Sequence, residues 1–434
     1  MKKIYFPYVK VILGINRLSG GARGDEIRKL VSNPKIWSMD PKGLKDLQFK
    51  AIKQAFEHHY NDCKFYGNYC KDEGSVRPED IKIADDILKI PQIPAEAFKK
   101  TRVSSIPANK IKTVVTTSGT SGSPSYLVRD SRSLGLIRMS YLSLAYIIIR
   151  KLVEEGIFSG IGEFSHYAMR NWYLGTFSPD SDESSTWLAN AFGSFAPFPN
   201  LLHIPIDFYL KGFEFDPKKI LETIKERNKE RKMMIFVGFH YVYNELMRYM
   251  DDTGEELDLD PDGSNLCYLI MAGGWKKLSG EKIDKEEFRR KLSEHFGIRE
   301  QNIIDAYGFG ESNCLALDLC SERRMHIPPT VLAVTRDPET LEIQDYGEEG
   351  LLSVWDPTMH SFPAFVITDD IVKLTEPFKC ECGLTTQTMK YIGRAPEAEL
   401  RSCGLRLQKS LTEEDEKGLE ELKERHKLRI DIGI

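Results

Sequence analysis

The chain has 434 residues, of which 41% are hydrophobic and 29% charged, and its formal net charge is −5. This is the composition of a globular protein with room for more than one domain, and it gives no reason to expect a nucleic-acid partner. The apolar stretch 142–149 is too short to span a membrane, no signal peptide is evident, and eight unevenly spread cysteines favour a reducing, cytoplasmic location.

Residues 1–95 are expected to form a helical segment that packs on the core. Apolar side chains in 44–56 recur at helical spacing, with Lys, Gln and Glu between them. Prolines at positions 91 and 94 punctuate the chain and end this segment.

A Ser/Thr/Gly-rich loop follows, between a predicted strand at 112–115 and a predicted helix at 134–152. Its residues are Thr117, Ser118, Gly119, Thr120, Ser121 and Gly122. Glycines let the backbone approach an anion closely and hydroxyls add donors, so the loop predicts a phosphate cradle. It lacks the Gly-Lys-Ser/Thr of a P-loop and the Gly-x-Ser-x-Gly of a hydrolase elbow, and its apolar flanks argue against a flexible linker.

Residues 164–198 have no clear period and could line a substrate pocket; His166 there is interpreted as a packed or solvated side chain rather than a base. An alternating pattern then predicts an α/β sheet with helices on both faces. The helices are expected at 217–231, 241–250 and 284–296, and the strands at 233–238, 266–272 and 303–307. Ligands bind at the carboxyl ends of such strands, where Gly273, Gly274 and 307–311 lie.

From about residue 329 the pattern changes to short strands and turns. Strands are expected at 331–334, 350–355, 365–368 and 370–374, and a charged, solvated helix at 411–427. We therefore divide the chain into four parts: the helical segment 1–95, an α/β nucleotide-binding core at 96–328, a β-rich subdomain at 329–395 and a short C-terminal region at 396–434.

Two pairs of residues, one Cys–His and one Cys–Cys, suggest a metal site. Cys320 precedes His326 by six positions, and Cys380 and Cys382 are separated by one residue. Together they would make a Cys₃His set for a structural Zn²⁺, which takes four ligands tetrahedrally, with Cys314 as a substitute ligand. The alternative is a group of free buried cysteines beside a capping histidine.

Four motifs in order resemble the acyl-adenylate-forming superfamily: 117–125, 307–311, 368–370 and 393–394. Within it the chain looks most like the acyl-protein synthetase (LuxE) family, and next like phenylacetate-CoA ligase, through 93–99, 272–276 and 380–383. The resemblance spans about residues 40–405. It implies an α/β fold with a large adenylate-forming N-terminal domain of mixed sheets flanked by helices, a β-rich subdomain and a truncated C-terminal region.

The resemblance also implies a role for each matching residue. The 117–122 loop would hold the ATP phosphates, Gly273 and Gly274 would pass close to adenine, and Tyr307 would stack on it. Glu311 would bind Mg²⁺, which prefers carboxylate and phosphate oxygens. Asp370 would accept hydrogen bonds from the ribose, and Arg394 would add charge near the same sugar.

Three features bear on the expected chemistry, and two of them depart from the superfamily pattern. Ser125 stands where the superfamily loop usually ends in lysine. The chain ends too soon after Arg394 for the superfamily's C-terminal domain with its catalytic lysine, so Lys276 or Lys277 would serve, or adenylation would be slow. Cys403 lies where acyl-protein synthetases carry their acyl-accepting cysteine, and flanking arginines would favour its thiolate; the alternative is an ordinary buried cysteine.

The expected activity is ATP-dependent conversion of a carboxylic acid, with a fatty acid favoured, to acyl-AMP and transfer to a thiol. That thiol would be Cys403, with a reductase or carrier protein as onward acceptor. One alternative is an aryl- or fatty acyl-CoA ligase using coenzyme A. Others are a non-catalytic nucleotide-binding protein, and a kinase or ATPase. The particular acid and the oligomeric state are not predicted.

Overall fold

The structure is a computed structural model that describes residues 24–33, 35–117, 123–159, 172–176, 206–208, 215–230, 232–273, 284–318, 320–396, 411 and 413–432. The chain forms two compact units. One, the parallel unit, comprises Ile147–Gly308 and Leu317–Leu319. The other, the antiparallel unit, comprises Pro7–Tyr146, Phe309–Ala316 and Cys320–Ile434.

The parallel unit is built on five parallel strands in the order β5-β4-β6-β7-β8. They are β4 (Trp172–Thr176), β5 (Ile206–Phe208), β6 (Met233–Phe239), β7 (Cys267–Ala272) and β8 (Ile303–Gly308). The β-branched and apolar runs of β6 to β8 are buried, as strands covered by helices require. The parallel sheet expected from the alternating pattern is therefore present.

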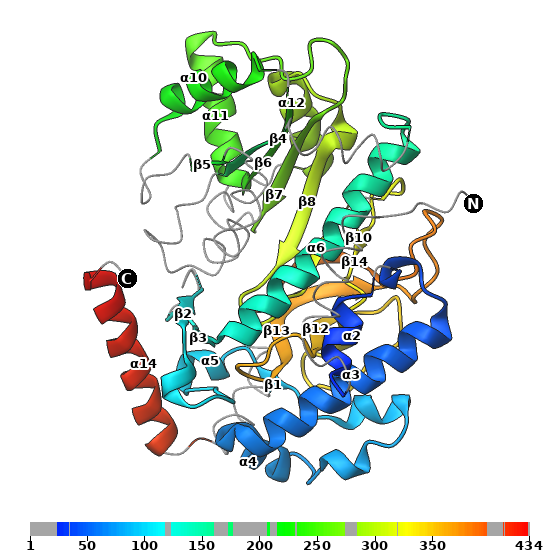
Figure 1. Cartoon of the computed structure of the whole chain (residues 1–434), viewed down its shortest axis with the longest axis vertical. Helices are drawn as coiled ribbons and strands as arrows, with labels where there is room; N and C mark the ends of the chain where they lie inside the picture. The colour runs from blue at the N-terminus through cyan, green and yellow to red at the C-terminus, as the bar shows by residue number, and fades with distance from the viewer. Residues whose placement is uncertain are drawn as a thin grey trace. The chain divides into compact units, whose positions relative to one another are not determined.

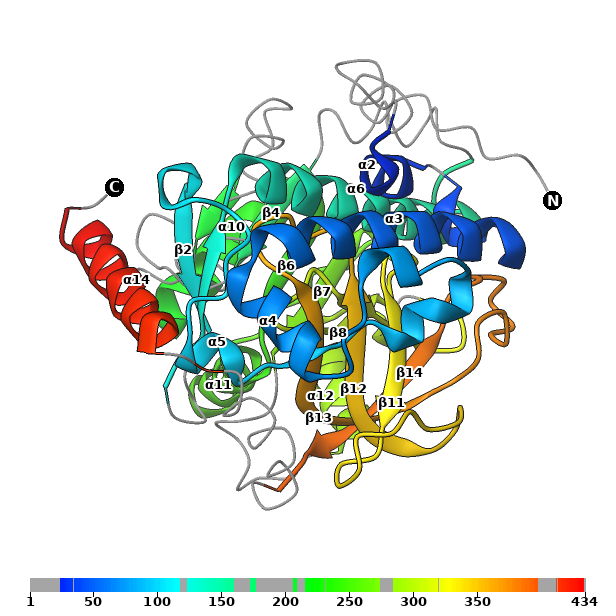
Figure 2. The same ribbon diagram turned by 90° about the horizontal axis from the view of Figure 1, so that it is seen from below.

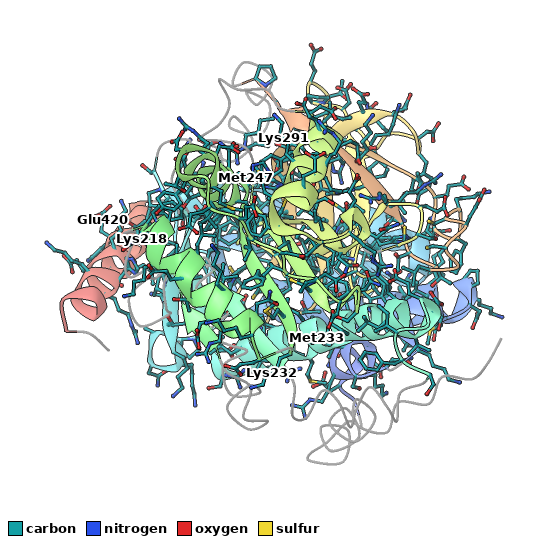
Figure 3. The ribbon with its side chains drawn as sticks, turned by 90° about the horizontal axis from the view of Figure 1, so that it is seen from above. Lys218, Lys232, Met233, Met247, Lys291 and Glu420 are labelled. Carbon is teal, nitrogen blue, oxygen red and sulfur yellow. The ribbon has the colours of Figure 1, made fainter. Side chains whose placement is uncertain are left out.

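Three helices pack on this sheet (Figure 1): α10 (Pro217–Asn228), α11 (His240–Thr253) and α12 (Lys285–Phe296). Asp216 and Asp284 cap the first turns of α10 and α12 through their side chains, and Gly297 ends α12 in a left-handed conformation. In Figure 3, Lys218 and Lys291 mark the charged faces of α10 and α12, whereas Met247 belongs to the apolar face of α11 and is buried.

The antiparallel unit contains a ladder in the order β11-β12-β13-β14-β10. Its strands are β10 (Met325–His326), β11 (Leu332–Arg336), β12 (Glu349–Asp356), β13 (Ala364–Leu374) and β14 (Thr388–Arg394). The strands β11 to β14 of this ladder are labelled in Figure 2. The residues expected in two strands, 365–368 and 370–374, form the single strand β13. Its pairing with β12 shifts register between Leu351 and Ser353, opposite the polar pair at 369–370. The strand β14 was not predicted because its polar and apolar residues do not follow its alternating burial: the exposed positions include the apolar Ile392.

The N-terminal helices belong to the same unit. They are α2 (Glu26–Val31), α3 (Pro41–Asp62), α4 (Lys64–Asp72) and α5 (Ala97–Lys100). Strand β1 (Ile93–Pro94) pairs in parallel with β13, and the buried indole of Trp355 donates to the carbonyl oxygen of Ile90 at 3.0 Å. The segment preceding the Ser/Thr/Gly loop is thereby fixed to the ladder.

The Ser/Thr/Gly loop connects two strands, which corrects the expected strand–loop–helix order. β2 (Thr113–Thr116) and β3 (Tyr126–Arg129) are antiparallel, and the helix α6 (Ser131–Glu154) begins only after β3. The run 126–129 is Tyr-Leu-Val-Arg, which has no polar and apolar alternation and is too short to be recognised as a strand beside the glycine-rich loop. The phosphate cradle is therefore expected at the tip of a hairpin.

The C-terminal helix α14 (Glu413–Ile432) lies against this hairpin rather than being solvated all round. The guanidinium of Arg425 donates to the carbonyl oxygens of Ala108 at 2.8 Å and Ile111 at 3.1 Å, and the rings of His426 and Tyr126 meet edge to face. One further short strand, β9, spans Leu315–Leu317. Among the described residues, no helix is both long and apolar enough to cross a membrane.

Candidate functional site

In the parallel unit, the carboxyl ends of β6, β7 and β8 form one edge, as they must in a parallel sheet. Gly273 follows β7 with φ of +79°, and a Cβ added there would lie 2.9 Å from Cδ1 of Phe239. The Phe239 ring, at the end of β6, stacks on Tyr241 with ring centroids 5.5 Å apart. Tyr307, near the end of β8, is half-buried. Glycine at 273 is thus required both by its backbone angle and by a close aromatic neighbour.

The same edge carries a charged network that sequence reasoning missed. His240, the first residue of α11, places Nδ1 2.7 Å from the carbonyl oxygen of Gly273 and Nε2 3.3 Å from Oδ1 of Asp305. The ammonium of Lys285 lies 2.8 Å from Oδ2 of the same carboxylate. Burial alone would raise the pKa of Asp305, but the hydrogen bond and charge of His240, together with Lys285, hold it well below its usual range. The available signal was the position of His240 directly after a buried strand.

In the antiparallel unit, Thr117 and Ser125 close the neck of the Ser/Thr/Gly loop. The amide of Ser125 donates to Oγ1 of Thr117 at 2.9 Å, and the amide of Thr117 donates to the carbonyl oxygen of Ser125 at 3.3 Å. The Ser125 hydroxyl in turn donates to Oε1 of Glu311 at 2.6 Å. The position where the superfamily has a lysine is therefore occupied by a buried side chain that contacts the expected metal ligand.

Glu311 is a buried carboxylate held from two sides. Burial raises the pKa of its carboxyl, and the hydrogen bond from Ser125 opposes that rise. The preceding peptide is fixed because the Arg129 guanidinium donates to the carbonyl oxygen of Gly310 at 2.8 Å while lying 4.9 Å from the centre of the Phe362 ring. A carboxylate that is kept dry and in one place is suited to receive a cation.

A second acidic group lies on β13. Burial raises the pKa of Asp369, against the opposing charges of Lys99 and Arg394. Asp370 is opposite Arg394 in the β13–β14 ladder, and Nε of Arg394 is 3.5 Å from Oδ1 of Asp370. The structure thus brings the expected ribose-binding carboxylate and the expected arginine into one ion pair.

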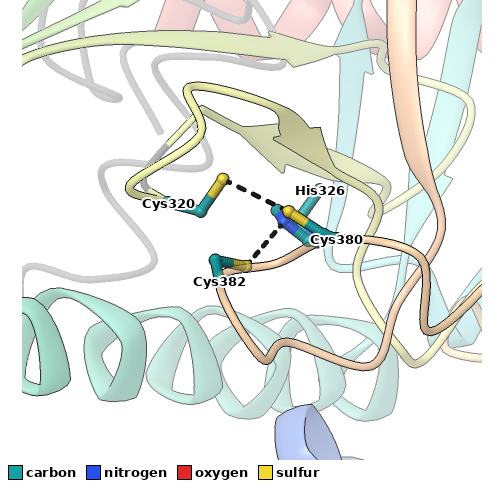
Figure 4. Close-up of side chains that lie close together, drawn as sticks. All are labelled: Cys320, His326, Cys380 and Cys382. Carbon is teal, nitrogen blue, oxygen red and sulfur yellow. Dashed lines mark hydrogen bonds between the residues drawn. The ribbon is translucent and has the colours of Figure 1, made fainter.

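The Cys–His pair and the Cys–Cys pair lie side by side, as Figure 4 shows. The ligand atoms of Cys320, His326, Cys380 and Cys382 all lie within 4.8 Å of one another. Sγ of Cys320 is 3.8 Å from Sγ of Cys380, and Sγ of Cys382 is 3.4 Å from Nε2 of His326. Zinc–sulfur bonds of about 2.3 Å at tetrahedral angles separate two sulfurs by about 3.8 Å, so these spacings fit Zn²⁺.

The surroundings of the cluster suit a thiolate site. Nδ1 of His326 is 2.9 Å from Oγ1 of Thr386, which orients Nε2 toward the sulfurs. The backbone amides of Arg324 and Leu384 donate to the sulfurs of Cys320 and Cys382 at 3.3 and 3.4 Å. The hydrogen bond from Cys382, with that from His326, lowers the pKa of Cys320 against the effect of burial, whereas burial raises the pKa of Cys380 and the hydrogen bond with Cys320 raises that of Cys382. Cys314 is buried elsewhere and does not join the four.

Several expected site residues lie outside the described residues. They are Ser118, Gly119, Thr120, Ser121, Gly122, Gly274, Lys276 and Cys403. Each unit is compact in itself: Gly273, Tyr307 and His240 belong to the parallel unit, whereas Thr117, Ser125 and Glu311 belong to the antiparallel unit.

The chain is similar to one described protein family and to named bacterial enzymes. The family described as "Acyl-protein synthetase, LuxE" matches residues 22–151 and 201–412. A long-chain-fatty-acid–luciferin-component ligase of Vibrio harveyi is 26% identical over 402 residues, covering 92% of this chain and 97% of the ligase. The ligase of the same name from Aliivibrio fischeri is 26% identical over 386 residues, covering 86% of this chain and 91% of the ligase.

Solved structures agree on the fold. An open conformation of 2-hydroxyisobutyryl-CoA ligase, in complex with 2-HIB-AMP and CoA, superposes with a TM-score of 0.62 and 14% identity. The match covers 83% of this chain and 77% of that ligase. The same ligase in the thioesterification state gives a TM-score of 0.62 over 84% of this chain. At this identity the likeness establishes the fold, and the expected α/β adenylate-forming architecture is confirmed.

Proposed function

This chain belongs to the acyl-protein synthetase (LuxE) family, and we propose that it uses ATP to convert a carboxylic acid to acyl-AMP and then passes the acyl group to a thiol. It is thus an AMP-forming acid–thiol ligase, the reaction class expected from the sequence. The observation that carries the proposal is Glu311, a buried carboxylate that Ser125 holds at the neck of the Ser/Thr/Gly loop. A loop that receives phosphates needs a fixed anionic partner for their counter-cation, and this pairing supplies one.

The names of the relatives support a long-chain fatty acid as the substrate. The acid's carboxylate oxygen attacks the α-phosphorus of ATP, the bond to the β-phosphate oxygen breaks, and pyrophosphate leaves. The thiol loses its proton to solvent and its sulfur attacks the acyl carbon; the bond from that carbon to the phosphate oxygen breaks, and AMP leaves. We assign the first thiol to Cys403, with coenzyme A as the alternative, and a reductase or carrier protein as the onward acceptor.

Other residues of the chain have roles in binding. Hydroxyls and amides of 117–122 donate to the phosphates, Gly273 and Gly274 admit adenine, and Tyr307 stacks on it. Asp370 accepts from the ribose hydroxyls while Arg394 orients that carboxylate. Lys276, with Lys277 as the alternative, is assigned the cationic role that the catalytic lysine of the C-terminal domain has in the superfamily. We expect the protein to act in the reducing environment of the cytoplasm.

Two metals fit residues on the chain. The carboxylate of Glu311, which is buried, is the kind of oxygen donor that Mg²⁺ takes. Bound there, Mg²⁺ would offset charge on the phosphate oxygens. Cys320, His326, Cys380 and Cys382 would hold a structural Zn²⁺ that joins β10 to the turn before β14.

The test is ATP–pyrophosphate exchange with a panel of fatty and aromatic acids. We expect exchange with long-chain fatty acids and its loss in Glu311→Gln, whereas the control Glu339→Gln, which changes an exposed glutamate, keeps it. ATP binding without exchange for any acid would favour a non-catalytic protein. Release of ADP or orthophosphate would instead indicate a kinase or an ATPase.

The same assay with Cys403→Ala identifies the acceptor. We expect this variant to keep exchange and to lose covalent labelling by a radioactive fatty acid. Absence of labelling in the wild type, with consumption of the adenylate by coenzyme A, would assign the chain to the acyl-CoA ligase alternative.

A further inference from the structure

We propose that His240 is a positioning residue that fixes the Gly273 peptide at the nucleotide edge of the parallel unit, as the middle member of a chain Asp305–His240–Gly273. The inference rests on the proposed function in one respect, namely that nucleotide binds at the Gly273 edge. All three members, and the groups around them, belong to the parallel unit.

Each ring nitrogen of His240 faces an acceptor. Nδ1 is 2.7 Å from the carbonyl oxygen of Gly273, and Nε2 is 3.3 Å from Oδ1 of Asp305. A carbonyl oxygen cannot donate, and an ionised carboxylate cannot either. Both ring nitrogens therefore lie against acceptors, and the imidazole bridges a buried carboxylate and a backbone carbonyl oxygen. The side chain of His240 is only 4% exposed, so water does not compete for these bonds.

The anion at the far end of the bridge is held in place by the rest of the unit. Lys285 of α12 contacts Oδ2 of Asp305 at 2.8 Å, and the Asp305 amide donates to Oδ1 of Asp318 at 2.6 Å. Arg289, also on α12, contacts Oδ2 of Asp318. Asp305 thus has its charge offset on one side and its backbone fixed on another. A carboxylate built into the sheet in this way is a rigid anchor for the imidazole.

The other end of the bridge is a peptide that needs an anchor. Gly273 has φ of +79°, a conformation that glycine adopts readily. Among the described residues, the pairing of β7 with β6 ends at Ala272, one residue before it. Phe239 lies against one side of Gly273 and His240 holds its carbonyl from another. Phe239, the last residue of β6, and His240, the first of α11, are consecutive, so the end of one strand helps to fix the backbone that follows the next.

If the His240 ring only filled space in the core, any substitution that removes the ring would weaken ATP binding equally. The test must therefore separate the bonds made by the two ring nitrogens. Asparagine places an amide near the position of Nδ1, and glutamine places one near that of Nε2. His240→Asn should keep the bond to Gly273 and lose that to Asp305, whereas His240→Gln should do the reverse. The two variants are matched in polarity and in their ability to bond, and differ mainly in which partner they retain.

We expect His240→Gln to weaken ATP binding, measured by calorimetry, by about tenfold, and His240→Asn by less than about threefold, which is the scale of one net hydrogen bond. In exchange assays the KM for ATP should rise in His240→Gln with little change in kcat. Asp305→Asn should also bind ATP within about threefold of the wild type, because a neutral imidazole can accept from the new amide while still donating to Gly273. Equal losses in the two His240 variants, or none in either, would overturn the proposal.

Hydrogen–deuterium exchange of the nucleotide-free protein gives a readout that does not depend on the reaction. The peptide containing the end of β7 should exchange faster in His240→Gln than in His240→Asn, with the strand β8 unchanged in both. If His240→Gln exchanges faster than His240→Asn but the wild type binds no ATP, the proposed function fails. In that case His240 still holds the Gly273 peptide, but its role in nucleotide binding is refuted. If the wild type catalyses exchange with pyrophosphate but the peptide does not respond, only the role of His240 is refuted.

Discussion

Replacing Ser125 by alanine tests the pairing on which the loop neck depends. Ser125 is fully buried and its hydroxyl donates to Oε1 of Glu311, which is 6% exposed. A hydrogen bond to a charged group contributes about 1.5–3 kcal/mol, and water cannot replace a donor at a site this dry. We therefore expect Ser125→Ala to lower the free energy of unfolding by about 2 kcal/mol at pH 8.

The loss should depend on pH with a definite sign. Burial raises the pKa of Glu311, so its protonated form is favoured in the folded state, and this contribution to stability is present at low pH and lost as pH rises through the folded pKa. The Ser125 hydroxyl offsets part of that loss by stabilising the carboxylate. Without it the folded pKa rises further, so the cost of Ser125→Ala grows with pH, from about 1 kcal/mol for a neutral bond to about 2 kcal/mol or more.

Urea unfolding at pH 5 and pH 8 measures this difference. The control is Ser353→Ala, which removes an equally buried hydroxyl whose partner is the carbonyl oxygen of Leu351 and should cost the same at both pH values. A cost for Ser125→Ala that is equal at pH 5 and pH 8, or larger at pH 5, would show that the hydroxyl does not stabilise the Glu311 carboxylate, and the reasoning would be refuted.

Three further expectations follow from single contacts. Gly273→Ala should destabilise the protein by about 1–2 kcal/mol because of its positive φ and the nearby Phe239, whereas Gly135→Ala, with open space around it in α6, should stabilise it by about 0.5–1 kcal/mol; thermal melting compares them. Asp370→Asn should raise the KM for ATP about tenfold without a matching change in kcat, and an unchanged KM would exclude it from ribose binding. Zinc released by a chelator, measured by mass spectrometry, should be about one per chain in the wild type and far below one in Cys382→Ser; metal-free wild type would reject the zinc site.

The sequence predicted those elements whose local signals agree with their surroundings. Helix α12, expected at 284–296, is present at Lys285–Phe296, with Asp284 before its first turn and Gly297 after its last as caps. The hairpin strand β3 was missed because four residues beside a glycine-rich loop carry too little periodicity. Boundaries of the four predicted segments stay predictions, since the compact units do not follow chain order.

Site residues divide in the same way. Cysteine spacing suggested the Cys₃His group, but only the pairing of β10 with β14 brings Cys320 to Cys380, 60 residues away. No pattern could reveal that Ser125 contacts Glu311 across 186 residues, because such a contact exists only once the hairpin is in place. His240 carried no motif, and its partners come from two other strands. The roles of the expected nucleotide-binding residues stay predictions.

The order of the chain in the two units has a consequence for how the protein is made. Gln92 donates its side-chain amide to the carbonyl oxygen of Val354, 262 residues later, so the N-terminal part of the antiparallel unit leaves the ribosome long before its partner strands exist. At about 5–20 residues per second that interval is roughly 13–50 seconds, while the parallel unit, contained between the two halves, is completed first. The rings of His59 and Tyr66, which meet Phe365 of β13 edge to face in the folded protein, therefore lack this partner through the interval.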